Sequence, residues 1–367
     1  MQLPNPSAIQ RILLIRLRHI GDVLLTVPAI RSFREAFPKA FITALVNAGT
    51  EEMLTDNPLL DEVLVFDPQW KTLPFGQRVQ QELGFLRQIR RRRFDLAVNF
   101  TEGERGAFLC MISGARYRVG LFSRKEKTGW KRFAFQQIVR IPDWRAHIVE
   151  QTLEIPQALG LPLRDRRVEI FYSEEDQKRL NNLLREEGAG DQSLLIHIHP
   201  TSRWLFKCWR DDGMARIIDA LQEREGVQVV LTSGSDDREL KKIHNILNFC
   251  RTQPINLAGK TTLKQMAALS RRSLFFIGVD TAPMHIAAAM GTPVIALFGP
   301  SGEFNWGPWG EGHVVIKKDF DCRPCGQDGC QGSKRSRCLE EISDDEVLEQ
   351  ALRFLEGARR SATCGSP

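Results

Sequence analysis

The sequence predicts an α/β protein of two doubly wound domains, each built on a mostly parallel β-sheet. Three observations point to this fold. Apolar segments of strand length alternate with longer amphipathic segments, a pattern typical of parallel sheets covered by helices on both faces. Residues 141–172 interrupt the alternation with three prolines and a glycine. The chain has 367 residues, which is too long for one typical domain.

The first half of the chain predicts four strands separated by helices. The strands are expected at Arg11–Leu17, Phe41–Asn47, Glu62–Phe66 and Asp95–Phe100. A helix is expected over Val23–Phe37, because apolar residues recur there on one face and Pro38 follows. Further helices are expected over Gln77–Arg92 and over His147–Leu159, the latter running out of the first domain.

The same alternation begins again at Leu194. Strands are expected at Leu194–His199, Val227–Thr232, Ile255–Leu257, Leu274–Val279 and Val294–Phe298. Helices are expected over Asp211–Glu225, Asp237–Cys250, Leu263–Ser270, a short segment that opens with Pro283, and Asp344–Glu356. Two α/β halves joined near residue 170 are therefore expected, with ligands bound at the carboxyl ends of the strands.

Composition and charge disfavour a membrane-spanning protein and indicate an acidic partner. No run of 18 apolar residues is present, and residues 1–10 lack the layout of a signal peptide. The net charge is +6, and arginines cluster at Arg90–Arg93 and again from Arg116 to Arg140, which suits an acidic partner. Nucleic acid is not the expected partner, because no nucleic-acid-binding signature accompanies the arginines. A solvated helix face explains Arg90–Arg93 equally well.

The eight cysteines fall into two groups. Cys110, Cys208 and Cys250 are scattered in apolar or motif surroundings, which is typical of free thiols in a reducing compartment, and we expect a cytoplasmic protein. A second group clusters in one loop, namely Cys322, Cys325, Cys330 and Cys338, with Cys364 in the tail. The spacing of the clustered four is consistent with a structural metal site or with free or redox-active thiols.

The first of three turns with chemically active side chains follows the first strand. It reads Arg18-His19-Ile20-Gly21-Asp22. Asp22 is either a helix N-cap, a common role for aspartate, or a carboxylate placed to take a proton from a hydroxyl group. The remaining glycines of the dinucleotide-binding fingerprint are missing, which disfavours a dinucleotide site.

The second turn, residues 199–209, follows the strand that begins at Leu194. Thr201 and Ser202 offer hydroxyl groups to phosphate oxygens. Lys207 offers a compact positive charge of the kind that stabilises a leaving diphosphate. The loop is expected to be anchored by its aromatic residues, Trp204, Phe206 and Trp209.

The third turn, residues 277–285, joins a buried strand to a short helix. Free N–H groups at the start of this helix, beside Asp280 and Thr281, would bind an anionic group such as a phosphate. An ordinary crossover in which Thr281 caps the helix explains the segment equally well when it is taken alone. A fourth turn, residues 232–237, either holds a ribose through an acid or caps the next helix, and the cap is slightly favoured.

Taken together, these turns resemble the lipopolysaccharide heptosyltransferases of glycosyltransferase family 9. The resemblance rests on Gly21-Asp22, residues 200–209, residues 257–262 and residues 278–285. It extends over about residues 11–298, and the spacing of Lys207, Cys208 and Trp209 is most similar to the heptosyltransferase III branch.

The resemblance implies a GT-B fold, in which two Rossmann-like doubly wound domains face each other across a cleft. It implies an acceptor-binding domain at residues 1–170 and a nucleotide-sugar donor-binding domain at residues 171–343. Residues 344–367 would form a helix that packs back toward the hinge and a flexible tail. The implied reaction moves L-glycero-D-manno-heptose from ADP-heptose to the lipopolysaccharide inner core at the cytoplasmic face of the inner membrane. It proceeds with inversion and without a cofactor or an essential metal.

The resemblance also assigns roles to individual residues. Asp22 matches the general base, and Lys207 matches a catalytic residue that contacts the donor phosphates. The other implied donor-binding residues are Thr201, Ser202, Gly234, Asp280, Thr281, Ala282 and His285. The implied acceptor-binding residues are Arg18, His19, Arg105 and Arg118.

Two other interpretations remain open on the sequence. A GT-B transferase or epimerase that uses a different nucleotide sugar would keep the same turns. A metal-binding or nucleic-acid-binding protein would depend on the cysteine loop and the arginines, and it would tolerate replacement of Asp22 and Lys207.

Overall fold

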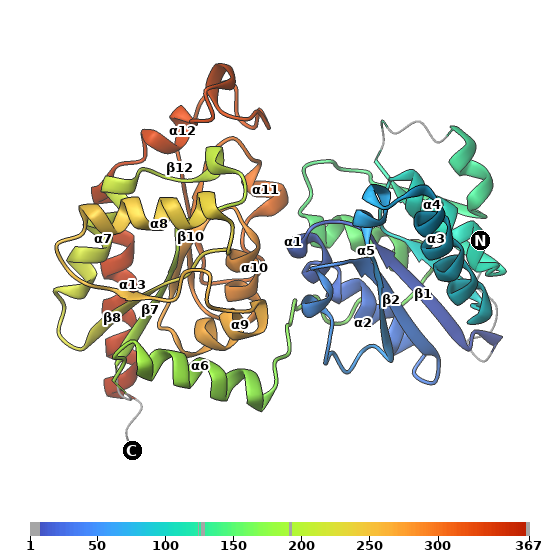
Figure 1. The fold of residues 1–367 in the computed structure, drawn as a ribbon, viewed down its shortest axis with the longest axis horizontal. Coiled ribbons are helices and arrows are strands. Elements are labelled where there is room, and N and C mark those ends of the chain that lie inside the picture. The colour runs from blue at the N-terminus through green and yellow to red at the C-terminus, as the bar shows by residue number, and fades with distance from the viewer. Residues whose placement is uncertain (1–7, 124, 126–128, 191–192, 365–367) are drawn as a thin grey trace. The chain divides into compact units, whose positions relative to one another are not determined.

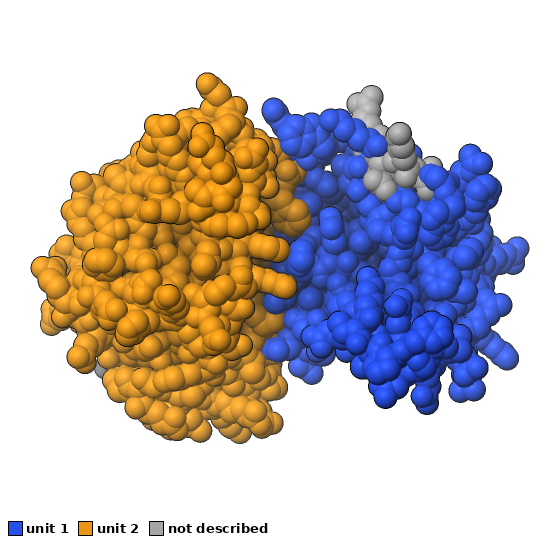
Figure 2. Space-filling model, turned by 45° about the horizontal axis from the view of Figure 1, so that its top comes forward, with its two compact units in different colours: residues 1–171 blue, residues 172–367 orange. Residues whose placement is uncertain are grey.

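The computed structural model describes residues 8–123, 125, 129–190 and 193–364. The chain divides into two compact units, Met1–Phe171 and Tyr172–Pro367, which are blue and orange in Figure 2. Each unit contains a parallel sheet with helices packed on it. None of the described helices is long and apolar enough to cross a membrane.

Unit 1 is built on a six-stranded sheet in the order β3-β2-β1-β4-β5-β6, and every neighbouring pair of strands is parallel. The strands are β1 (Arg11–Arg16), β2 (Phe41–Asn47), β3 (Glu62–Phe66), β4 (Leu96–Asn99), β5 (Tyr117–Phe122) and β6 (Gln137–Arg140). The four strands predicted in this half are confirmed. The apolar pattern does not predict β5 and β6, because both segments mix apolar residues with arginine.

Helices cover both faces of the unit 1 sheet (Figure 1). α3 (Phe75–Arg91) and α4 (Glu104–Ser113) pack together over the face that includes Leu13 and Ile15. α2 (Val27–Ala36) and α5 (Ile148–Ala158) pack together on the other face. The unit also contains the 3₁₀ helices η2 (Glu51–Met53), η3 (Pro68–Thr72) and η4 (Gly129–Ala134).

The prediction of a single helix over residues 23–37 is wrong. The chain forms a short helix α1 (Ile20–Leu24) and then starts again with α2. Pro28 lies in the first turn of α2 and has no N–H to donate to Leu24, so a continuous helix would lose a hydrogen bond. The N–H of Thr26 instead donates to the carbonyl of Val23 at 3.2 Å, which closes α1.

Unit 2 repeats the architecture with a second six-stranded parallel sheet, in the order β12-β11-β10-β7-β8-β9. The strands are β7 (Leu194–His199), β8 (Val227–Leu231), β9 (Ile255–Asn256), β10 (Phe276–Val279), β11 (Val294–Phe298) and β12 (Val314–Lys317). The five strands predicted here are confirmed, and the edge strand β12 is an addition.

The helices of unit 2 are α6 (Glu174–Glu186), α7 (Asp211–Gln222), α8 (Asp237–Phe249), α9 (Leu263–Arg272), α10 (Ala282–Ala289), α11 (Glu303–Trp306), α12 (Arg337–Glu340) and α13 (Asp344–Cys364), with η5 (Leu205–Lys207) and η6 (Cys330–Gly332) as 3₁₀ turns. α6 was not predicted, although the sequence contains a recognisable signal for it: Ser173 and Asp176 form a reciprocal capping box at its start.

The terminal helix α13 belongs to the core of unit 2. It packs on α7 and contributes Val347, Ala351 and Leu355 to the main apolar cluster. Trp209 lies in the same cluster, and its indole N–H donates to the carbonyl of Ile342 just before the helix at 3.3 Å. The predicted return of this helix toward the hinge stays a prediction.

Because all strands of a unit are parallel, their carboxyl ends lie at one edge of the sheet. β1 therefore delivers the turn with Asp22 to that edge of unit 1. In unit 2, β7 and β10 are neighbours, so the turns that contain Lys207 and Asp280 emerge side by side.

Candidate functional site

In unit 1, the carboxyl end of β1 places Asp22 in a buried position. Asp22 lies in the first turn of α1, and its side chain is 7% exposed. Its Oδ1 accepts a hydrogen bond from the Arg16 guanidinium at 2.9 Å, and its Oδ2 makes no hydrogen bond within the described residues. The N-cap of α1 is His19, so Asp22 is not the helix cap. A buried, oriented carboxylate with a spare oxygen is able to accept a proton.

Arg16, the last residue of β1, fixes the position of Asp22. Its guanidinium also donates to the backbone carbonyls of Phe100 and of Asp22 itself. Burial lowers the pKa of Arg16 from its ordinary value, and the negative charge of Asp22 opposes that shift. Arg16 was not among the predicted site residues. The available signal was a cation that ends an otherwise apolar strand, because a buried arginine needs a partner.

Three of the four predicted acceptor residues lie near the carboxyl edge of the sheet. Arg18 and His19 are exposed in the turn between β1 and α1. Arg105 follows β4, where its guanidinium pairs with both oxygens of Glu82 at 2.5 and 2.9 Å and stacks on the Phe66 ring. The roles of these three residues stay predictions.

Arg118 does not belong with the others. It is the second residue of β5 and therefore lies near the amino edge of the sheet, at the opposite end from Asp22. Its side chain donates to the backbone carbonyls of Ala115 and Ala134 at 2.6 and 2.7 Å. These bonds tie β5 to the segments around it, and the acceptor role of Arg118 stays a prediction.

In unit 2, an ion pair joins two of the predicted turns. The Lys207 ammonium, at the end of η5, donates to Oδ2 of Asp280 at 2.6 Å. The Asp280 side chain is only 8% exposed, whereas that of Lys207 is 23% exposed. The lysine is therefore held at the edge of the sheet with part of its charge accessible, which suits a group that meets an incoming anion.

A buried glutamate joins the second turn to the fourth. Oε2 of Glu239, on α8, accepts from the Thr201 hydroxyl at 2.7 Å and from the N–H of Gly234 at 3.2 Å. The predicted donor contacts of Thr201 and Ser202 compete with internal bonds, because the Ser202 hydroxyl also accepts from the N–H of Trp204. Glu239 was not among the predicted site residues, although an acid on the apolar side of an amphipathic helix is a usable signal.

The fourth turn serves as a helix cap, as the sequence slightly favoured. The Asp236 carboxylate accepts from the N–H of Arg238 at 3.0 Å and caps α8. The carboxylate also pairs with the Arg238 guanidinium, which lowers the pKa of Asp236 to about 2. Asp236 is therefore engaged in holding α8.

The third turn leads into α10 with an unfilled cap. Thr281 is the N-cap, but its side chain makes no capping hydrogen bond, so the ordinary capped crossover is not what forms here. Thr281 and Ala282 are partly exposed, and His285 is buried one turn further along. Pro283 has no N–H, and the N–H of Met284 donates to the Thr281 carbonyl at 3.2 Å. The N–H of Ala282 is therefore the first-turn donor without an acceptor among the described residues.

A chain of buried polar side chains runs beneath these turns. The Thr232 hydroxyl bonds to Nε2 of His197 at 2.7 Å and to Nδ1 of His199 at 2.8 Å. The other ring nitrogen of His197 bonds to Ser270 at 2.9 Å. Burial lowers the pKa of His199 to about 3 and that of His197 well below its ordinary value. Both rings are therefore neutral at physiological pH.

Two of the three aromatic residues of the second turn are buried and anchor the loop, and the third is exposed. Trp209 and Phe206 are buried, whereas Trp204 is 46% exposed. The Lys242 ammonium donates to the carbonyl of Trp209 at 2.8 Å, which fixes the end of the loop. Two of the three rings are thus anchors, as predicted.

The clustered cysteines do not gather as metal ligands. Cys322, Cys325 and Cys330 are exposed and Cys338 is buried, all as free thiols. No group of three or more His, Cys, Asp or Glu side chains suited to a metal ion occurs among the residues placed by the structure.

Burial raises the pKa of both Cys208 and Cys250 to about 11, which makes them poor nucleophiles.

Comparison with known proteins decides the classification. The family model for glycosyltransferase family 9 (heptosyltransferase) matches residues 83–335. The chain belongs to this family. Lipopolysaccharide heptosyltransferase 3 of Escherichia coli (strain K12) is 35% identical over 297 residues, which is 80% of this chain and 84% of that protein. A second Escherichia coli lipopolysaccharide heptosyltransferase 3 is 33% identical over 80% of this chain and 84% of its own length. The predicted family and its III branch are confirmed.

Solved structures of family 9 enzymes have the same fold. The family 9 glycosyltransferase of Veillonella parvula DSM 2008 superposes with a TM-score of 0.81 at 24% identity, covering 95% of this chain and 97% of that one. ADP-heptose lipopolysaccharide heptosyltransferase II of E. coli gives a TM-score of 0.75 at 22% identity, covering 95% and 100%. This family 9 chain is therefore a glycosyltransferase with the predicted GT-B fold of two Rossmann-like domains.

The buried histidines predict that unit 2 of this family 9 enzyme loses stability in mild acid. Both rings are neutral when folded and bind protons on unfolding below the ordinary pKa of 6.5, so the free energy of unfolding falls as the pH drops from about 6.5 toward 3. The expected loss is about 1.4 kcal/mol per pH unit for each histidine. Hydrogen exchange of the β7 and β8 amides at pH 7 and pH 5, corrected for intrinsic rates, measures it. β1 and β2 of unit 1 are the internal control, and equal changes in both units would contradict the prediction.

Proposed function

We propose that this enzyme transfers L-glycero-D-manno-heptose from ADP-heptose to the inner core of lipopolysaccharide, with inversion at the anomeric carbon. The observation that carries the proposal is the similarity to lipopolysaccharide heptosyltransferase 3 over 80% of the chain. The acceptor binds unit 1 and the donor binds unit 2 in this proposal. The site of action is the cytoplasmic face of the inner membrane, where a lipid-anchored core would be accessible.

The donor diphosphate binds where Lys207 and the start of α10 meet. The partly exposed Lys207 ammonium supports this assignment, as does the Ala282 N–H at the start of α10, beside the unfilled Thr281 cap. Cations and helix N-termini both stabilise the negative charge that develops on a leaving diphosphate. Gly234 and Glu239 would bound the nucleoside side of this pocket, because they join the β8 turn to Thr201.

Asp22 acts as the general base. The acceptor hydroxyl oxygen forms a bond to the anomeric carbon while the bond from that carbon to the diphosphate oxygen breaks. The proton of the hydroxyl passes to a carboxylate oxygen of Asp22, and ADP leaves with the bonding electron pair. Arg16 supports this role by holding Oδ1 of Asp22 so that Oδ2 stays available.

The substrate assignment is tested by product analysis. With defined truncated core acceptors, we expect transfer from ADP-heptose and little transfer from other nucleotide sugars. Mass spectrometry and anomeric NMR coupling of the product check the added sugar and the inversion. Efficient transfer from a different nucleotide sugar, or epimerisation of the donor without an acceptor, would favour the alternative GT-B activities instead.

Replacing the base should remove turnover while keeping donor binding. Asp22→Asn is expected to lower kcat by about 10²-fold or more, the usual share of a positioned base. KM for ADP-heptose should change little, because the donor binds the other unit. Initial rates at saturating acceptor measure both constants.

A second variant separates chemistry from stability in this test. Asp22→Asn alone leaves the buried Arg16 charge without its partner, which costs about 3–5 kcal/mol of stability. The double variant Arg16→Gln with Asp22→Asn removes both charges and should recover much of that loss. Near-parental turnover in either folded variant would place the base elsewhere.

Lys207 should matter for the donor beyond its part in the ion pair with Asp280. Lys207→Met is expected to lower kcat/KM for ADP-heptose by about 10²-fold, since one donor to a developing anion is lost. Lys318→Met is the matched control, because Lys318 is also a partly exposed, ion-paired lysine of unit 2, bonded to Glu346 at 2.7 Å. The same kinetic loss in both variants would mean that Lys207 acts only through folding.

A further inference from the structure

Exposed apolar side chains gather on one part of unit 1. Of the thirteen large apolar residues exposed within the described chain, six belong to α3, α4 and η4. These are Phe75, Val79, Leu83, Met111, Trp130 and Phe133. α3 packs on α4, and α4 packs on η4, so the three elements form one continuous surface (Figure 1). We call this surface, with the arginines of α3, the docking face.

The ridge along α3 joins the apolar and basic parts of the docking face. Residues four apart in a helix follow one another along a ridge. Here that ridge consists of Phe75, Val79, Leu83, Arg87 and Arg91. Phe75 is 83% exposed and Leu83 is 44% exposed. The exposed ridge therefore combines apolar side chains, which can enter a membrane interface, with guanidinium groups, which are attracted to anionic lipids.

A groove beside the ridge is apolar as well. It has a volume of ≈540 Å³ and lies between α3 and α4. Its apolar lining comes from Phe75, Val79, Leu83, Leu86 and Phe108, and its rim has Lys71, Arg78 and Arg105. The only acid that lines it, Glu82, is neutralised by Arg105. An apolar hollow with a cationic rim matches the arrangement of acyl chains beneath anionic headgroups.

The charge of this segment is strongly one-sided. Residues 68–93 include seven basic residues and one acid. Arg92 is committed to Glu62, because its Nε donates to that carboxylate at 2.9 Å. Arg87 and Arg91 form no ion pair within the described residues, and Arg91 lines two hollows at the end of α3 together with Arg93. These cations are available to a polyanionic surface.

We propose that the docking face binds the surface of an anionic lipid bilayer. Basic residues near such a surface each strengthen binding, and exposed aromatic and aliphatic side chains enter the interface. The proposal rests on the proposed function only for the reason to approach a membrane, since the acceptor there is lipid-anchored. The binding itself requires neither donor nor acceptor.

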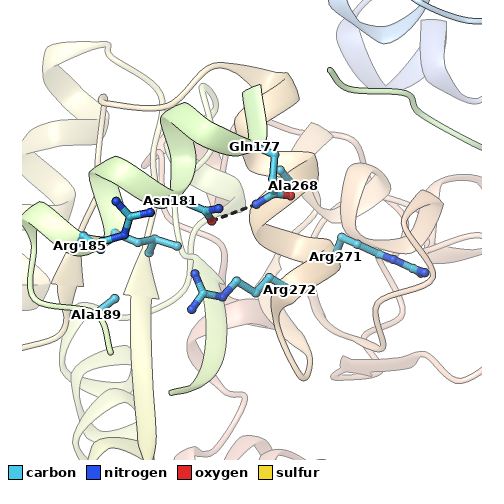
Figure 3. A pocket seen from close by; sticks show the side chains of 8 residues that line it. Gln177, Asn181, Arg185, Ala189, Ala268, Arg271 and Arg272 are labelled. Carbon is cyan, nitrogen blue, oxygen red and sulfur yellow. Dashed lines mark hydrogen bonds between the residues drawn. The ribbon is translucent and has the colours of Figure 1, made fainter. Parts of the chain in front are cut away.

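Unit 2 has an arginine-rich hollow that serves as a control. It has a volume of ≈350 Å³ and lies between α6 and α9 (Figure 3). Arg185 flanks it from α6, whereas Arg271 points away from Asn181 (Figure 3). Both arginines are in the last turns of their helices, where cations stabilise the C-terminal end. None of the exposed large apolar residues described lies on α6 or α9.

The experiment measures co-sedimentation of the full chain with vesicles, without sugar substrates. The parent should bind phosphatidylglycerol–phosphatidylcholine vesicles and should bind phosphatidylcholine vesicles weakly. Binding should weaken as the Debye length falls from about 10 Å at 0.1 M salt to about 3 Å at 1 M. Arg87→Glu with Arg91→Glu should lower the partition coefficient about 30-fold or more, since each arginine near the surface is worth about fivefold. Phe75→Ser with Leu83→Ser should lower it about tenfold.

The control variant is Arg185→Glu with Arg271→Glu, which changes the net charge equally and should bind within about twofold of the parent. If this variant lost as much vesicle binding as the α3 arginine variant, net charge alone would explain the effect and the proposal would be overturned. Absence of binding of the parent to anionic vesicles would also overturn it. All variants should retain kcat on a delipidated, water-dissolved core acceptor. If heptose transfer is absent while vesicle binding follows this pattern, the proposed function fails and the docking face stands. If heptose transfer is present while vesicle binding does not follow this pattern, the docking face fails and the proposed function stands.

Discussion

Burial of opposite charges in pairs is the interaction on which the candidate site depends. Arg16 and Asp22 are both buried where β1 ends, and neither charge would be tolerated there alone. Each partner therefore fixes the position of the other, and the turn that follows β1 has one arrangement. Lys207 and Asp280 do the same for two turns of unit 2, with Asp280 as the more buried partner. The chemistry thus depends on side chains whose geometry folding already determines.

Beneath the unit 2 turns, neutral hydrogen bonds replace charge. The Thr232 hydroxyl links His197 and His199, and Ser270 on α9 is the last member of this hydrogen-bonded series. Glu239 extends the same layer outward by accepting from Thr201 and from the backbone of Gly234. Fully satisfied buried polar groups specify one packing of a core, because any rearrangement would leave a donor or acceptor unpaired. The loops above this layer therefore rest on a fully hydrogen-bonded base.

The sequence was sufficient to predict two parallel α/β halves, since apolar runs such as those of β10 and β11 indicate strands covered on both faces. It was insufficient for β5 and β6, where arginine and glycine obscure the pattern, and for the break at Pro28, where apolar periodicity continues across two helices. Asp22, Lys207 and Asp280 could be found because they follow predicted strands. Arg16 and Glu239 could not be assigned a role, because their partners become neighbours only after folding. The position of Arg118 near the amino edge of the sheet could not be predicted, because it required β5 to be known.

Pairing of Lys207 with Asp280 also bears on how a donor would exchange under the proposed function. In the free protein the two charges compensate each other, so unit 2 folds without an isolated buried carboxylate. An incoming diphosphate must compete with Asp280 for Lys207, and the uncapped start of α10 supplies additional attraction for the anion. When ADP leaves, Asp280 is at hand to pair with the lysine again, so departure of the product exposes no uncompensated charge. A carboxylate beside the phosphate site lowers the affinity for donor and product alike, and that favours release of ADP after each transfer.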